Sequence, residues 1–160
     1  MAKVYLGILR IAIGFIFLWA FLDKVFGLGF STASERAWIT GSSPTAGYLT
    51  NATHGPFADI FQSLAGNPLI DILFVVGLLG IGTAIILGVA MRLASFSGVV
   101  MMLLMYLSAF PPANNPIVDD HIIYALVLLI LPPLKSAEVL GLGKKWSKSN
   151  IVKSLPFLRN

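Results

Sequence analysis

The stretch VYLGILRIAIGFIFLWAFL, residues 4–22, decides the fold of this chain. It is about 19 residues long and apolar apart from Arg10, and an α-helix of that length can cross the ~30 Å hydrocarbon core of a bilayer. A cleavable signal peptide would have a shorter apolar run without an arginine, and small residues for cleavage closer than Ser31. Residues 4–22 are therefore predicted to form a retained membrane-spanning helix.

Three further apolar runs predict an all-α, integral membrane four-helix bundle with spans at about 4–22, 69–91, 93–110 and 117–134. Only Arg92 separates the second run from the third, which predicts a tight helical hairpin. The third and fourth runs are joined by the proline-rich residues 111–116, through which no helix can continue. The length suits a single transmembrane domain, residues 1–160.

The composition places lipid around much of this domain and limits its chemistry. Of the residues, 57% are hydrophobic and 11% are charged, whereas a soluble domain carries roughly 25% charged residues. The absence of cysteine excludes disulfides, thiol chemistry, cysteine-ligated clusters and c-type haem. Of the two histidines, His54 falls in a predicted loop and His121 in a helix, so neither a bis-histidine haem nor a metal site is expected. Any redox cofactor would be non-covalent: a diffusible molecule or a group held by a partner.

The lysines and arginines follow the positive-inside rule. One side of the predicted membrane holds nine basic residues and one acid, Glu138; the other holds six acids and two basic residues, Lys24 and Arg36. We therefore expect a multi-pass protein of the cell membrane with both termini in the cytoplasm, an extracytoplasmic loop at 23–68 and a basic cytoplasmic tail at 135–160. The tail is expected to lie on the anionic inner surface. Nucleic acid is not an expected partner, because topology accounts for the basic residues.

The loop at 23–68 is predicted to contain two short interfacial helices. Residues 32–35, Thr-Ala-Ser-Glu, match a capping box and predict a short helix that presents Trp38. A second helix is predicted from Pro56 to Ala65, with Gly66 as its stop. Its apolar side chains fall on one face, so it would lie on the outer leaflet or cap the bundle.

Polar residues of the first helix are candidates for binding. Arg10 and Lys24 share one helix face and are ~21 Å apart along the axis. Charges within membrane segments are costly and usually face the protein interior, so both are candidate contacts for an anion or a quinone. The alternative is that Arg10 and Lys24 extend to the headgroups on either side.

The fourth helix supplies the candidate catalytic residues Asp120, His121 and Tyr124. A carboxylate, an imidazole and a phenol at the mouth of a bundle suit proton transfer to or from a quinone headgroup. The alternative is a helix N-cap with ion pairs to Lys24 or Arg36. In the second helix, Gly80, Ala84 and Gly88 form a small-residue stripe that is explained by close helix packing.

The segment from Leu9 to Leu18, followed by residues 24–27, resembles the first helix of the DoxX/DoxD family. The hairpin at 88–94 and residues 141–143 after the fourth helix are also similar to that family. The resemblance implies the four-helix layout and places the family's recurrent basic positions on Arg10, Lys24 and Arg92. It also implies a role like that of the DoxD subunit of thiosulfate:quinone oxidoreductase, whose second subunit has no counterpart in this chain.

The first hypothesis is therefore a quinone-interacting membrane subunit of a redox system. In it, Lys24, Arg36 and Trp38 would attract a small anion or a second redox subunit. The alternative is a non-catalytic membrane anchor or assembly module for partner redox proteins, and a small-molecule carrier ranks last. Whether the chain is an enzyme subunit is open, and so is its oligomeric state, a homo-oligomer included.

Overall fold

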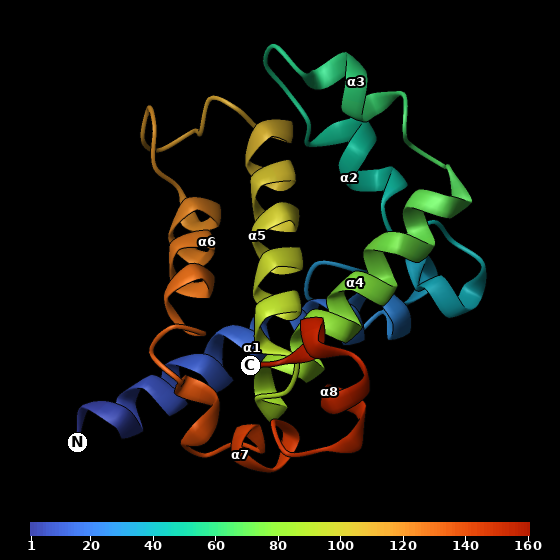
Figure 1. Cartoon of the computed structure of the whole chain (residues 1–160). Coiled ribbons are helices and arrows are strands. Elements are labelled where there is room, and N and C mark those ends of the chain that lie inside the picture. The colour runs from blue at the N-terminus through green and yellow to red at the C-terminus, as the bar shows by residue number, and fades with distance from the viewer.

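The computed structural model describes residues 1–160, and all of its regular structure is helical. Three long helices, α1 (Ala2–Phe26), α4 (Pro68–Leu87) and α5 (Met91–Ser108), are long and apolar enough to cross a membrane. The chain is thus a membrane protein by the length and composition of these helices. α4 packs against both α1 and α5, and α6 (Asp120–Ile130) lies beside α5, while α1 crosses behind α5 in the view of Figure 1.

The three long helices confirm three of the four predicted spans, with shifted boundaries. α1 continues past the predicted end at residue 22, until Gly27 ends it in a left-handed conformation (φ 62°). α4 ends in the same way at Gly88 (φ 71°), and α5 begins at Met91, so the tight hairpin is confirmed. Glycine suits both ends because it adopts positive φ without strain.

The fourth predicted span is only partly helical. The prediction covered residues 117–134, whereas α6 has 11 residues, or about 16 Å of helix, which is short of a bilayer crossing. Asp119 caps the start of α6, so residues 117 and 118 remain outside the helix. Pro132 and Pro133 have no N–H to continue the hydrogen-bond ladder, although the Leu134 N–H still reaches the Ile130 carbonyl at 3.4 Å. A four-span bundle is therefore not confirmed.

Close contact between α1 and α4 depends on glycines other than the predicted stripe. A Cβ atom on Gly82 would lie 2.6 Å from the backbone nitrogen of Leu18, and one on Gly14 would lie 2.8 Å from an Ile86 side chain. Gly80 has nothing within 4 Å of such an atom, so the packing explanation is wrong for Gly80. Residues 80 and 82 lie about 200° apart around a helix, and only Gly82 faces α1.

The segments at one end of the helices form what we call the loop end: residues 27–67 and the connection at 109–119. Residues 27–67 contain η1 (Ser34–Arg36), η2 (Trp38–Thr40), α2 (Ala46–Asn51) and α3 (Ala58–Gln62). The predicted capping box is wrong: Ala33 precedes η1 without a side-chain cap, and the Thr32 hydroxyl accepts a bond from Lys24 instead. The second predicted helix is confirmed in shortened form as α3.

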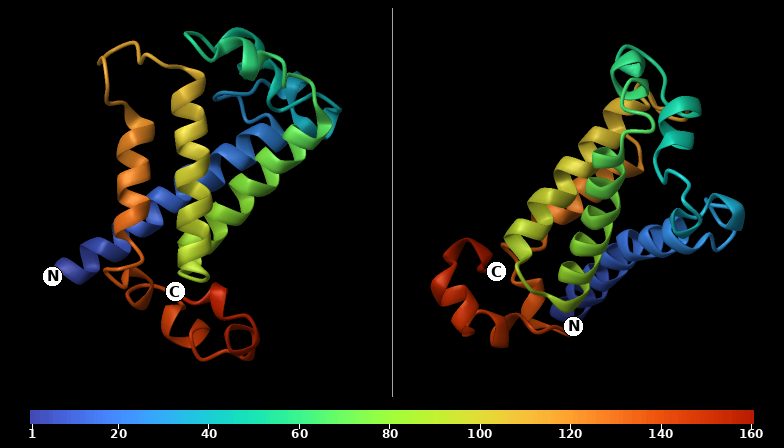
Figure 2. Two further views of the ribbon diagram at one scale, coloured as in Figure 1. Left: turned by 45° about the horizontal axis from the view of Figure 1, so that its top comes forward. Right: turned by 90° about the vertical axis from the view of Figure 1, so that its right-hand side faces the viewer.

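We call the opposite end the hairpin end, because the turn between α4 and α5 lies there. Residues 135–160 fold against it as η3 (Ser136–Glu138), α7 (Gly143–Trp146), α8 (Asn150–Ser154) and η4 (Pro156–Leu158). The Asn160 side chain donates to the Gly88 carbonyl and accepts from the Met91 N–H. The two ends of the chain therefore lie at the same end of the helices (Figure 2).

Replacing Gly82 with alanine should push α1 away from α4 and cost about 1–3 kcal/mol of stability, because the new methyl group has no room. The matched variant Gly80→Ala should be neutral or stabilising by up to about 1 kcal/mol, because alanine favours a helix and the position is open. Thermal unfolding in detergent measures both. Equal effects at the two positions would contradict the close contact of Gly82 with α1.

Candidate functional site

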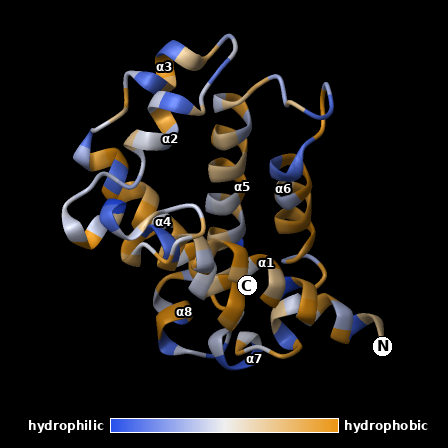
Figure 3. Cartoon of the chain, turned by 180° about the vertical axis from the view of Figure 1, so that it is seen from behind, coloured by the Kyte–Doolittle hydropathy of each residue, from blue (hydrophilic) through white to orange (hydrophobic).

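The start of α6 brings together a carboxylate and an imidazole. One oxygen of Asp119 accepts hydrogen bonds from the backbone N–H groups of His121 (3.0 Å) and Ile122 (3.2 Å), which caps the helix. The other oxygen is 2.6 Å from the His121 ring Nδ1, and this is the one ion pair of the structure. Both side chains are about a quarter exposed, at 24%. In Figure 3 this polar start stands out against the otherwise hydrophobic α6.

Two opposing effects act on the Asp119 carboxyl. Partial burial alone would raise its pKa, because burial disfavours the charged form. The hydrogen bonds from the His121 ring and from the backbone of Ile122 and His121, together with the charge of His121, outweigh burial and hold the pKa of Asp119 below its ordinary value. The carboxylate therefore stays charged and keeps the imidazole oriented through Nδ1.

The predicted catalytic trio is only partly brought together. Asp120 is exposed and its side chain makes no hydrogen bond, while Tyr124 lies one turn deeper, half-buried against the core. The acid that bonds His121 is Asp119, which the sequence prediction did not place in the site. The spacing Asp-x-His at a helix start is the signal that could have found it, because the capping residue already faces the first turn.

The predicted binding residues lie apart from this pair. Arg36 in η1 and Trp38 in η2 lie near the end of α1, on the other side of α4 and α5 from α6 (Figures 1 and 2). The Lys24 Nζ is 3.5 Å from the Thr32 hydroxyl. The N-cap of the alternative interpretation is confirmed in Asp119, but neither Lys24 nor Arg36 forms the ion pair with Asp119 or Asp120 that this alternative included.

Two buried carboxylates that sequence reasoning did not assign hold the loop end together. Asp71 on α4 accepts from the hydroxyls of Ser43 (2.8 Å) and Thr45 (2.5 Å). Asp23 on α1 accepts from the Ser31 hydroxyl and from the backbone N–H of Ser31 and Phe30. Both acids fix the loop to helix ends through hydroxyl and amide donors, without a basic partner.

At the hairpin end, Arg10 is fully buried and surrounded by backbone carbonyls. Its Nη1 donates to the carbonyls of Ile85 and Ile86 at the end of α4; Ile85 also accepts from the Gly88 N–H at 3.2 Å, whereas Ile86 has no other donor. Its Nη2 donates to two further carbonyls and its Nε to one, at Val139 (3.2 Å), Leu140 (2.8 Å) and Ser136 (3.3 Å).

These five hydrogen bonds determine whether Arg10 can bind an anion or extend to the headgroups. A guanidinium has five N–H donors, and five carbonyls accept them, so none remains for a bound anion. The side chain does not extend to the headgroups either, because it has no exposed surface. Arg10 links α1 to the end of α4 and to residues 136–140 through these five hydrogen bonds, which we call the Arg10 tie.

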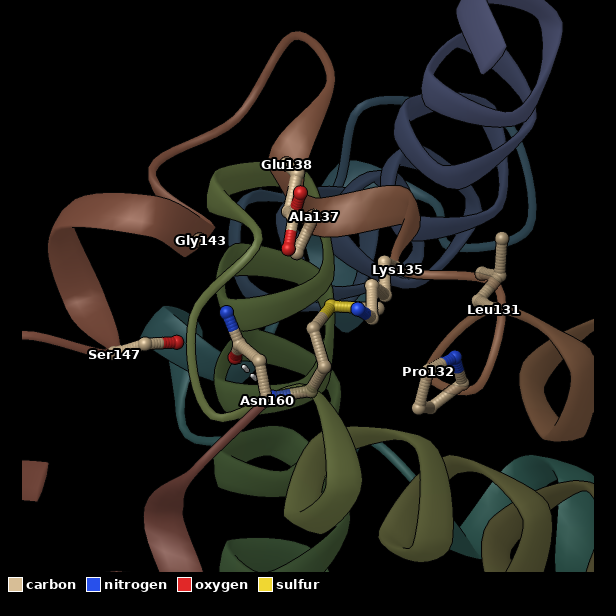
Figure 4. Close-up of a pocket in the computed structure, with 9 residues that line it drawn as sticks. Leu131, Pro132, Lys135, Ala137, Glu138, Gly143, Ser147 and Asn160 are labelled. Atoms are coloured by element: carbon tan, nitrogen blue, oxygen red, sulfur yellow. Dashed lines mark hydrogen bonds between the residues drawn. The ribbon is translucent and has the colours of Figure 1, made fainter. Parts of the chain in front are cut away.

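Two pockets lie beside this tie, and none of the predicted site residues lines them. One, of about 90 Å³, lies between the start of α5, the end of α6 and Asn160 (Figure 4). The other, of about 110 Å³, lies between the first turns of α1 and residues 134–139. Lys135 and Glu138 line both, so the two pockets flank one short segment.

Replacing Arg10 with glutamine should lower stability by at least about 3 kcal/mol, because the carbonyls of Ile86, Val139 and Leu140 lose their only donor. The control is Arg92→Gln, which removes the same charge from an exposed position at the same end and should stay within about 0.5 kcal/mol. The unfolding temperatures of both variants, measured in the same detergent, test this difference. If Arg10→Gln unfolds at the same temperature as Arg92→Gln, Arg10 is not the tie.

The pair at the α6 start predicts a pH dependence of stability. A carboxyl whose pKa is lowered on folding adds stability above its unfolded pKa of about 3.9, and that stability is lost as the pH falls through the lower folded value. Asp119→Asn keeps a capping side chain but removes the charge. The difference in unfolding temperature between wild type and Asp119→Asn should therefore shrink from pH 6 to pH 3. Asp120→Asn serves as control, and a constant difference for Asp119→Asn would contradict the assignment.

Comparison of the chain with protein-family models, with curated proteins and with solved structures gives no match. The resemblance to the DoxX/DoxD family stays a prediction from the sequence.

Proposed function

We propose that the protein is a quinone-interacting subunit of a membrane redox system, of the kind that the sequence resemblance implies. The supporting observation is the Asp119–His121 pair at the start of α6. It places an oriented, partly exposed imidazole where an apolar helix begins. The phenol of Tyr124 lies one turn further along the same helix.

The chemistry needed is proton transfer coupled to electron transfer from elsewhere. Reduction of a quinone to its quinol takes up two electrons and two protons. The Asp119 carboxylate accepts a hydrogen bond from Nδ1–H of His121, and Nε2 has no partner in the protein. The imidazolium form of His121 can therefore donate Nε2–H to a quinone carbonyl, and the neutral ring that remains accepts a proton at Nε2. The chain has no cysteine, so the electrons would come from a second redox subunit or from a bound donor. Lys24, Arg36 and Trp38, at the other side of the loop end, remain candidates for attracting that anion or subunit.

Access for an apolar quinone would be from the lipid. One face of α6 after His121 is exposed and apolar, with Ile123 exposed by 48% and Leu126 by 51%. A prenyl tail can lie along such a surface while the headgroup meets the polar start of the helix. Asp120, exposed beside His121, is suited to exchange protons with water.

The test is a binding titration with the protein in nanodiscs, using short-chain ubiquinone and menaquinone analogues. His121→Gln should weaken binding by about tenfold, which corresponds to one hydrogen bond of roughly 1.4 kcal/mol. His54→Gln is the matched control: this exposed loop histidine contacts only the carbonyls of Ala52 and Pro111. The absence of quinone binding, or equal losses in both variants, would overturn the proposal.

A second candidate is a non-catalytic anchor or assembly module. The observation that favours it is the exposed apolar surface of the loop end, where Ile60 on α3 is exposed by 62% and Phe57 by 38%. Under this function, alanine at Asp120 or His121 leaves complex assembly intact, whereas replacing Phe57 and Ile60 with serine abolishes it. Co-purification of partner subunits separates the two candidates.

A further inference from the structure

The hairpin end concentrates positive charge. Eight lysine and arginine side chains there are exposed, and the single acid among them is Glu138: the cations are Lys3, Arg92, Lys135, Lys144, Lys145, Lys148, Lys153 and Arg159. Arg10 adds a ninth, buried cation. None of these nine forms an ion pair within the chain. Their charge must therefore be balanced by water, ions or another molecule.

The buried cation lacks a counter-charge most clearly. Arg10 is surrounded by dipoles alone, and a buried charge is normally paired with an opposite one. The pocket of about 110 Å³ lies directly against this group: Ser136 and Val139 line it, and their carbonyls accept bonds from the Arg10 guanidinium. A negative charge in that pocket would be separated from Arg10 only by this segment.

The lining of the same pocket matches an amphipathic ligand. Lys3 and Lys135 supply two ammonium groups from two different parts of the chain, and Leu6 and Leu134 supply apolar surface. The pocket lies at the first turns of α1, a candidate membrane span. The ends of a membrane-spanning helix lie where lipid headgroups meet acyl chains. Basic pockets between helices at this depth bind lipid headgroups.

We propose that the pocket formed by Lys3, Leu6, Leu134 and Lys135 binds the phosphate of an anionic glycerophospholipid. The phosphate lies between the two lysine ammonium groups and in front of the Arg10 tie. One acyl chain lies along Leu6 and Leu134 toward the lipid-facing sides of α1 and α6, where Leu9 and Ile130 are exposed. The site is independent of the function proposed for the α6 start.

Glu138 sets the choice among phospholipids. It lines the pocket without bonding to either lysine, so it leaves a net charge of one positive unit there, which suits a monoanionic headgroup. A zwitterionic phosphatidylethanolamine would instead use Glu138 to hold its ammonium. The variant Glu138→Gln therefore distinguishes the two: it should strengthen binding of an anionic lipid and would weaken binding of an ethanolamine lipid.

The experiment is native mass spectrometry of the purified full chain, titrated with phosphatidylglycerol, phosphatidylethanolamine or phosphatidylcholine of identical acyl chains. One phosphatidylglycerol should bind in preference to the other two. The double variant Lys3→Gln/Lys135→Gln should bind it roughly 30-fold more weakly. The control Lys148→Gln/Lys153→Gln removes the same charge from exposed positions outside the pocket and should bind nearly as wild type. Inorganic phosphate at millimolar concentration should not displace the lipid.

Three results would overturn the proposal. Equal binding of the three lipids would show that no headgroup is recognised, and equal losses in both double variants would show only a general attraction to charge. Weaker retention of phosphatidylglycerol by Glu138→Gln would exclude an anionic occupant. The substituted lysines are exposed, and an unchanged unfolding temperature in lipid-free detergent confirms that each variant is folded.

Discussion

The buried guanidinium of Arg10 is the constraint on which the arrangement of the helices depends. It joins three parts of the chain that are far apart in sequence: the first helix, the end of α4 and residues 136–140. Within a membrane neither the cation nor the Ile86 carbonyl, which has no other donor, could be left unsatisfied, so each group supplies what the other lacks. Gly141 belongs to the same arrangement, because a side chain there would meet the guanidinium at 2.8 Å.

Both ends of the helices contain buried charged side chains that hydrogen-bond to uncharged groups, and the sign of the buried charge differs between the two ends. At the hairpin end a buried cation is satisfied by carbonyls, and at the loop end the buried carboxylates of Asp23 and Asp71 are satisfied by hydroxyl and amide donors. These ends are therefore fixed by hydrogen bonds. The Asp119–His121 pair differs because it joins two titratable side chains and is partly exposed, which is why we place the proposed proton chemistry there.

Local sequence patterns predicted the features that depend on a single segment. The three long apolar runs became α1, α4 and α5, and the proline-rich residues 111–116 ended a helix as expected. The late start of the fourth helix could also have been predicted from Asp119 as an N-cap, and its early end from Pro132 and Pro133. The partners of Arg10 could not be predicted from the sequence, because they are backbone carbonyls of distant segments and every residue has such a carbonyl. The sequence also could not show that Gly82, and not Gly80, is the glycine in close contact with α1. That depends on which face of α4 meets α1, and tertiary packing sets this face.

The most direct test of the Arg10 tie is nitrogen-15 NMR of the arginine side chains in the intact protein. The chain has four arginines, and Arg36, Arg92 and Arg159 are exposed, so they serve as internal references. A guanidinium held by five carbonyls should show two separate Nη resonances and slow hydrogen exchange, whereas the three exposed ones should each show one averaged Nη resonance. A single averaged and rapidly exchanging signal for Arg10 would contradict the tie.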